Sequence, residues 1–82
     1  MPAAAHRTNR KPSKRLLQIL TENMRCRRRQ CGLSQEELAD MCRLHRTYIS
    51  SVERGQRNIT IGTLEAIAKA LCAKPDELLR KR

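Results

Sequence analysis

The amino-acid sequence predicts an all-α domain with a compact core. Apolar residues recur at helical spacing through most of the 82 residues, and no segment shows the alternation that is typical of a strand. Capping residues and glycines divide this pattern into five short segments. The chain has one Tyr and neither Phe nor Trp, so its core must be aliphatic, which favours packed helices over a β-sandwich.

Residues 13–31 are expected to form the first helix. Ser13 is a suitable N-cap, and Gly32 follows directly after the predicted end. Apolar side chains at helical spacing give this helix a buried face: Leu16, Leu17, Leu20, Met24 and Cys31. Its last turns carry an arginine cluster, RCRRRQC, which is either a solvated helix face or a surface beside a phosphate backbone.

Residues 1–13 are predicted to be a flexible basic N-terminal arm, and residues 14–82 are predicted to form the folded domain. The arm combines prolines, small residues and cations without apolar periodicity. It is either a solvated tail or a basic segment that adds phosphate contacts or enters a minor groove.

Two short helices are expected next, over residues 35–42 and 46–54. Ser34 and Glu37 form a capping box, SQEE, at the start of the first of these, and Gly55 ends the second. Two helices joined by so few residues must cross steeply, which requires small and apolar residues where their backbones approach. The chain supplies them: Leu38, Ala39, Cys42, Leu44, Ile49 and Val52. This pattern predicts a helix-turn-helix unit.

The outward face of the third helix is polar, and we interpret it as a surface that reads DNA. Small hydroxyl side chains and basic side chains can enter a major groove and reach base edges there. Five residues are predicted to read bases: His45, Arg46, Thr47, Ser50 and Ser51. Five are predicted to contact phosphates: Gln35, Tyr48, Arg54, Arg57 and Asn58. Simple solvent exposure is the alternative for each, and Tyr48 is equally suited to the core.

A fourth helix is expected after Thr60, and Pro75 is expected to open a short fifth helix, PDELL. Their apolar side chains are candidates either for a homodimer interface or for the core of a single chain: Ile67, Leu71, Leu78 and Leu79. A chain this short buries only a small core, so a second copy would add stability.

The charge of the chain indicates the kind of partner it binds. A formal net charge of +10 predicts a polyanion, with double-stranded DNA first and a membrane surface or RNA as alternatives. The scarcity of aromatic side chains argues against single-stranded RNA. No apolar run is long enough to span a membrane and the N-terminus has no apolar signal region, so the expected location is the cytoplasm.

No cofactor, metal, small-molecule substrate or catalytic activity is expected. The four cysteines form no Cys-x-x-Cys pair and have no ligand spacing with the two histidines, so we interpret them as reduced thiols, mostly small apolar core residues. The chain also lacks a paired nucleophile and base and a phosphate-binding glycine loop, which argues against an enzyme.

Residues 32–71 resemble a known family. Their sequence, GLSQEELADMCRLHRTYISSVERGQRNITIGTLEAIAKAL, is similar to the phage repressor/Cro-like (XRE) helix-turn-helix family. The resemblance implies a compact five-helix, lambda-repressor-like domain that binds DNA, usually as a homodimer on a pseudo-palindromic operator. The part HRTYISSVERGQRNIT looks especially like the small controller proteins of restriction–modification systems, which regulate their own operon. The alternative is an antitoxin-like regulator, or a prophage or plasmid repressor, whose main partner is another protein.

The chain departs from the family pattern at three positions. Arg43 stands in the turn where the family often has Gly, which implies strain or a different turn because that position favours a left-handed backbone. Arg27 stands where an apolar residue is common, and His45 replaces the usual Ser or Asp at an N-cap, which favours a DNA contact. Glu53 resembles the family's structural Glu, so we expect it to bond to an internal partner.

Overall fold

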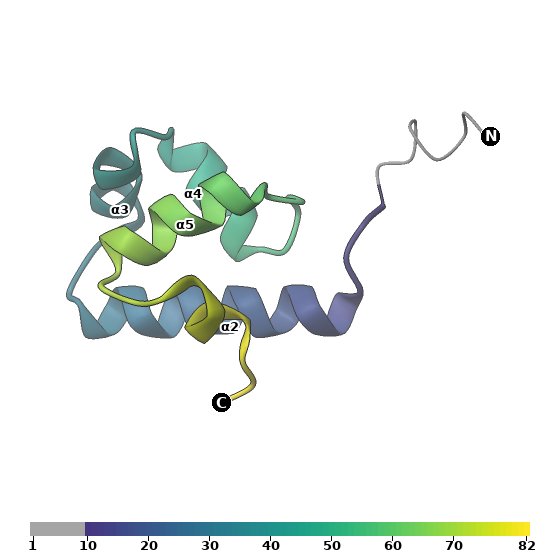
Figure 1. Cartoon of the computed structure of the whole chain (residues 1–82). Helices are drawn as coiled ribbons and strands as arrows, with labels where there is room; N and C mark the ends of the chain where they lie inside the picture. The colour runs from purple at the N-terminus through teal and green to yellow at the C-terminus, as the bar shows by residue number, and fades with distance from the viewer. Residues whose placement is uncertain (1–9) are drawn as a thin grey trace.

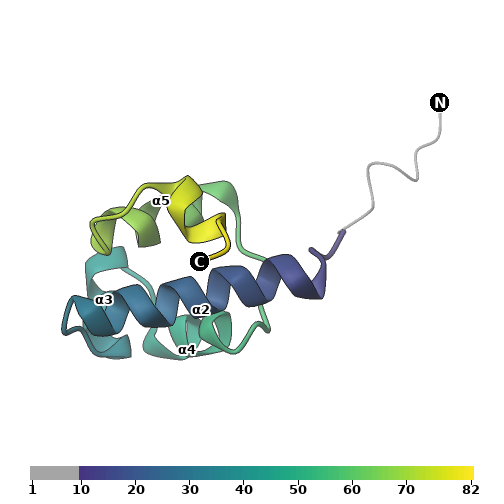
Figure 2. The ribbon, with the colours of Figure 1, turned by 90° about the horizontal axis from the view of Figure 1, so that it is seen from below.

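The computed structural model describes residues 10–82, which form four α-helices and one 3₁₀ helix. In chain order these are α2 (Lys14–Gln30), α3 (Gln35–Cys42), α4 (Arg46–Glu53), α5 (Ile61–Ala70) and η1 (Pro75–Leu79). The long helix α2 forms one side of the molecule, and α3, α4 and α5 lie above it in Figure 1, with α4 and η1 in contact with α2. Seen from below, α4 and α5 lie on opposite sides of α2 (Figure 2).

The predicted helical class is confirmed for the described residues, which contain no strand. The fifth predicted helix requires a correction, because PDELL forms a 3₁₀ helix. A segment of five residues favours the tighter bonds to the third residue back, such as Glu77 N to Lys74 O at 2.9 Å. Residues 1–9 of the predicted arm lie outside the described residues.

The cap residues define where the helices begin and end. Ser13 Oγ accepts a hydrogen bond from the first turn of α2, and Ser34 and Glu37 form the complete capping box of α3. Gly32 follows α2 with a φ of +70°, and Gly55 follows α4 with a φ of +74°. Glycine adopts this left-handed conformation without a Cβ clash, so the chain can leave each helix sharply.

The core lies between α2 and the other helices. Its buried apolar side chains are Leu20, Met24, Leu38, Ala39, Ile49, Val52, Leu64, Ile67, Ala68, Leu71 and Leu78. Ile67 and Leu71 are fully buried and Leu78 is 2% exposed. The prediction that these three side chains contact a second chain is therefore wrong, because they offer it no surface. Of the four dimer candidates, Leu79 remains available at 37% exposure.

Arginines of the RCRRRQC cluster hold α2 against the other helices. Arg27 donates hydrogen bonds to the carbonyl oxygens of Leu71 at 3.2 Å and Cys72 at 2.8 Å. This polar cap on the end of α5 explains a cation at a position where an apolar residue is common. Arg25 donates to the carbonyl oxygen of Glu53 at 2.7 Å, which joins α2 to the end of α4.

Asn23 holds the C-terminal segment in place. Its side chain is buried, and Nδ2 donates to the carbonyl oxygens of Leu78 at 2.9 Å and Arg80 at 2.8 Å. These bonds satisfy a buried amide and fix the end of η1 against α2. Throughout residues 10–82, every buried polar side-chain atom has a hydrogen-bond partner.

The four cysteines are free thiols, of which Cys26 and Cys42 are half-buried and Cys31 and Cys72 are exposed. The last two therefore do not act as the core residues that the sequence predicted. Burial raises the pKa of the Cys42 thiol, which keeps it protonated at neutral pH. No cluster of three potential ligands within residues 10–82 could hold a metal ion. The helices of that range are all too short or too polar to cross a bilayer.

Candidate nucleic-acid interface

A left-handed turn joins α3 to α4. Arg43 has a φ of 58° and a ψ of 43°, and Leu44 N donates to Ala39 O at 2.9 Å. The predicted left-handed position is therefore confirmed, although it is occupied by an arginine rather than a glycine. Ala39 and Ile49 are 1% and 0% exposed where the two helices cross. The turn and this close contact set the angle between α3 and α4.

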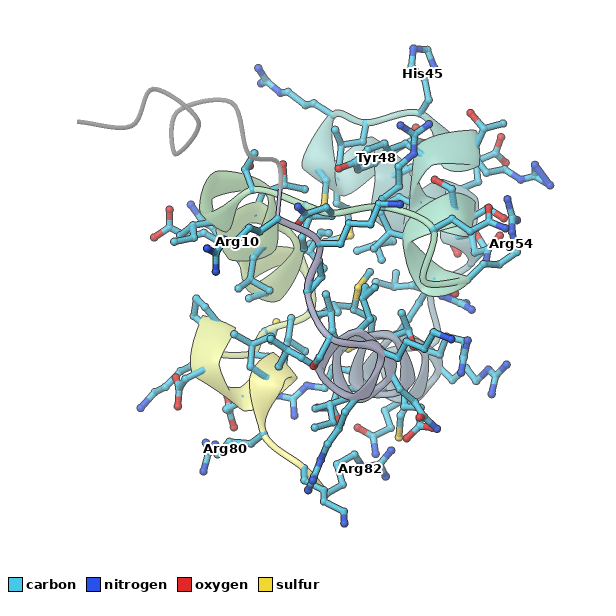
Figure 3. All side chains as sticks on the ribbon, turned by 90° about the vertical axis from the view of Figure 1, so that its right-hand side faces the viewer. Arg10, His45, Tyr48, Arg54, Arg80 and Arg82 are labelled. Atoms are coloured by element: carbon cyan, nitrogen blue, oxygen red, sulfur yellow. The ribbon has the colours of Figure 1, made fainter. Side chains whose placement is uncertain are left out.

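The start of α4 is exposed. His45 is its N-cap residue and makes no side-chain hydrogen bond to the helix. His45, Arg46 and Thr47 are exposed, and His45 protrudes from the top of the molecule in Figure 3. The free N–H groups of a helix start attract anions, and no side chain of the helix occupies them here. This end of α4 can therefore accept a phosphate or enter a groove.

Ser50 and Arg54 lie one turn apart further along α4. Arg54 Nη1 donates to Ser50 Oγ, and Arg54 Nε donates to Gln56 Oε1 at 3.3 Å. Arg54 is exposed and Ser50 is half-buried. These bonds hold the Arg54 guanidinium across the outward face of α4. Ser50 and Arg54, which were both predicted to contact DNA, therefore lie on the same surface.

Ser51 does not point outward, which corrects the prediction that it reads bases. Its side chain is 7% exposed; Oγ donates to Tyr48 O at 2.7 Å and accepts from Arg57 Nε at 3.1 Å. Ser51 directly precedes the buried Val52, and a serine is small enough to be enclosed beside it. The Arg57 guanidinium also lies 5.3 Å from the centre of the Tyr48 ring, a cation–π contact. Ser51 therefore helps to hold the Arg57 guanidinium beside the Tyr48 ring.

Glu53 joins the end of α4 to the start of α3. It is 2% exposed, and its carboxylate accepts from Arg28 Nε at 2.7 Å, Arg28 Nη2 at 3.2 Å and Gln35 Nε2 at 3.1 Å. The expectation of an internal partner is confirmed. Gln35 is half-buried at the first position of α3, so the bond that it donates to Glu53 fixes its side chain beside the helix N-terminus.

The loop after α4 contacts the beginning of the described chain. Asn58 Nδ2 donates to Arg10 O at 3.0 Å, and both residues are exposed. Arg57 and Asn58 thus lie near the base of the arm. Arg10 belongs to the segment predicted as a basic arm. One exposed cation, Arg43 in the turn, was not among the predicted contacts. Its sequence signal was weak, because an isolated arginine in a connecting segment is usually only solvated.

Comparison with known proteins places this geometry in a family. Residues 24–78 match the helix-turn-helix family model. The chain is 51% identical over 65 residues to the control protein C.SmaI of Serratia marcescens, which covers 79% of this chain and 77% of that protein. A hypothetical transcription factor from Neisseria has a similar crystal structure, with a TM-score of 0.79, 41% identity and coverage of 90% of this chain and 86% of that one.

A third similar protein has been solved with DNA. The restriction–modification controller protein C.Esp1396I, as a tetramer in complex with its natural 35-base-pair operator, gives a TM-score of 0.72 and 39% identity. The match covers 82% of this chain and 87% of that one. From the helix-turn-helix geometry and these matches together, this chain belongs to the phage repressor/Cro-like (XRE) helix-turn-helix family, and restriction–modification control proteins are among its relatives.

Proposed function

We propose that this protein is a sequence-specific DNA-binding transcription regulator, the controller of a restriction–modification system. The observation that carries the proposal is the exposed, uncapped start of α4, where His45, Arg46 and Thr47 are presented on a helix-turn-helix unit. A similar protein, C.Esp1396I, is a controller bound to its operator. The proposed site of action is the cytoplasm, where a bacterial regulator meets its operator.

The side chains of the unit divide into two proposed roles. Those on the outward face of α4 enter the major groove and read base edges: His45, Arg46, Thr47 and Ser50. Those around it bind phosphates: Gln35, Tyr48, Arg54, Arg57 and Asn58. Ser51 acts indirectly in this scheme, because its hydroxyl holds Arg57 in position.

We propose a homodimer that uses the apolar surface around Leu79, the one predicted interface residue that is exposed. Leu16, Ile61 and Leu79 are 41%, 84% and 37% exposed, and they line one hollow of about 180 Å³. Covering these side chains with a second copy would remove apolar surface from water. A dimer places two α4 helices about 34 Å apart, one turn of DNA, on a pseudo-palindromic operator.

Selection of bound sequences from a random duplex pool at near-physiological salt tests the proposal. We expect a pseudo-palindrome whose half-sites are centred about 10–11 base pairs apart. The controller role further requires this sequence upstream of the protein's own gene. Recovery of no consensus would contradict sequence-specific binding and would favour a regulator whose main partner is a protein.

Arg46→Ala tests base reading on the selected site. We expect a loss of about 1–3 kcal/mol of binding free energy and a relaxed preference at one base pair, measured by titration of matched and mismatched duplexes. Lys69→Ala is the matched control, because Lys69 is an exposed cation on α5 outside the unit. An equal loss on all sequences would assign Arg46 to a phosphate instead.

A further inference from the structure

A second basic surface lies away from the helix-turn-helix unit. Arg80 and Arg82 are at the end of the molecule opposite His45 (Figure 3). Here the C-terminal tail, residues 80–82, borders two hollows of about 330 Å³ and 450 Å³ beside α2. Both hollows are lined by Cys26, Gln30 and Arg82, so they adjoin along α2. We call the two hollows together the tail groove.

The tail groove has a large excess of positive charge. Its lining contains six cations and two carboxylates: Arg25, Arg27, Arg29, Arg80, Lys81 and Arg82 against Glu22 and Glu77. Both carboxylates already accept bonds within the chain, Glu22 from Gln18 Nε2 at 2.9 Å and Glu77 from Lys74 N at 2.7 Å. The fold therefore gathers cations here without supplying matching anions.

Three of these cations are free to bind a ligand. Within residues 10–82 the ion pairs are Arg28 with Glu53 and Arg80 with Asp76, so Arg29, Lys81 and Arg82 have no such partner there. Arg25 and Arg29 are also one helical turn apart, where like charges repel. A bound anion would relieve this repulsion and occupy the free guanidinium groups.

We propose that the tail groove binds an acidic segment of a partner protein. Guanidinium groups take carboxylates in paired hydrogen bonds, and arginine clusters recognise acidic motifs in this way. The half-buried Cys26 and Ala73 add apolar contact to the same walls, which suits a peptide that carries small apolar side chains among its carboxylates. Duplex DNA fits less well, because it is a wide convex rod whose charged backbone has no apolar group to place in a hollow of this size.

This surface adds a second kind of partner to the proposed DNA binding. Because Arg80 and Arg82 lie opposite His45, one molecule can hold a duplex on the exposed start of α4 and an acidic segment in the tail groove at once. A regulator with this arrangement carries its protein partner to the site that α4 selects.

A charge-matched pair of variants tests the proposal on the full chain. The probe is a fluorescently labelled peptide of alternating Glu and Ala, titrated by anisotropy at near-physiological salt. The groove variant is Arg29→Ala/Lys81→Ala/Arg82→Ala, and the control variant is Arg46→Ala/Arg54→Ala/Arg57→Ala. Each removes three positive charges, so a purely general attraction between opposite charges would respond equally to both.

The two variants should behave in opposite ways. We expect the groove variant to bind the peptide at least about tenfold more weakly and to keep its affinity for the selected duplex. The control variant should keep the peptide affinity and lose the duplex. Equal weakening of the peptide by both variants would overturn the proposal. Failure of the duplex selection with intact peptide binding would overturn the proposed function alone.

Cys26 provides a second measurement inside the groove. It lies in the wall shared by both hollows, so bound peptide should slow its alkylation by iodoacetamide, read for each cysteine by mass spectrometry. Cys42, which is half-buried outside the groove, is the internal control. Protection of Cys26 by duplex DNA but not by the peptide would make the groove a second DNA surface and overturn the proposal.

Discussion

The two helices of the helix-turn-helix unit begin in opposite ways. Helix α3 starts with a complete capping box, in which Ser34 Oγ accepts from Glu37 N at 2.9 Å and Glu37 Oε1 accepts from Ser34 N at 2.8 Å. Helix α4 has the same length but starts at His45, which makes no capping bond. The first helix satisfies its own N-terminus, and the second leaves it open.

This difference separates stability from recognition within one short segment. Helix α4 depends on what surrounds it: Ile49 and Val52 in the core, and the buried Glu53 bonded to Arg28. Isolated helices of this length are marginal in water, so α4 needs these contacts to form. Its open start is then available to a ligand, whereas the capping box already bonds backbone N–H groups at the start of α3.

The largest effect is expected where α4 depends on its surroundings. Glu53→Ala removes the buried carboxylate and leaves Arg28 without its anion, so we expect a loss of about 3–5 kcal/mol in the free energy of unfolding, measured by urea denaturation. Glu22→Ala, at an exposed carboxylate of α2, is the control and should change it by less than about 0.5 kcal/mol. A loss for Glu53→Ala as small as that of the control would mean that packing alone holds α4.

A smaller loss is expected from breaking the cap of α3. Ser34→Ala removes the side-chain acceptor of the capping box and should cost about 1 kcal/mol of unfolding free energy. At a protein concentration where the unchanged protein and the Ser34→Ala variant are both folded, their affinities for the selected duplex should be nearly equal. A marked loss of DNA affinity in the variant would indicate that Ser34 contacts the duplex directly.

Adding a capping side chain at the start of α4 should raise stability, whereas removing the cap of α3 lowers it. His45→Ser supplies a capping hydroxyl, so we expect a gain of about 0.5–1 kcal/mol in unfolding free energy. The same variant should bind the selected duplex more weakly, because it removes the proposed base contact. If stability and affinity rose together, the imidazole would have no role in binding.

The smallest expected difference between the helices is in their response to acid. Hydrogen bonds from the backbone and then the side chain of Ser34 lower the pKa of Glu37 from its ordinary value of 4.5. A carboxyl group with a lowered pKa in the folded state stabilises the protein above about pH 4.5, and this contribution is lost as the pH falls through the folded-state value. Glu37→Gln should therefore reduce the dependence of the urea midpoint on pH between about 5 and 3. If the urea midpoint of Glu37→Gln depended on pH as strongly as that of the unchanged protein, protonation of Glu37 would not be coupled to unfolding.

Much of the fold could be predicted because it depends on local signals. Ser13, Ser34 and Gly55 mark helix ends through bonds and backbone angles within a few residues of themselves, and the structure places the ends there. The left-handed Arg43 could be anticipated for the same reason, since a short turn between crossing helices constrains its own backbone.

The misplaced residues depend on neighbours outside their own helices. The helical pattern alone permits either face at Ser51 and Leu71. Ser51 is bonded by Arg57 in the loop that follows α4, and Leu71 packs in the core among side chains of other helices. Arg27 was an unexplained cation until its carbonyl partners, more than forty residues away, were placed beside it. Spacing along one helix carries no information about such partners.

The bonds of Asn23 have a consequence for the order of folding. They connect residues separated by 55 and 57 positions, so they close a long loop of chain, whereas the contacts between α3 and α4 close short ones. Long loops cost more entropy to close, so η1 should dock after the helix-turn-helix unit and detach before it. In native-state hydrogen exchange, the amides of η1 would then exchange through a local opening that leaves α4 protected. The tail groove would be complete only in molecules that have finished this last step of folding.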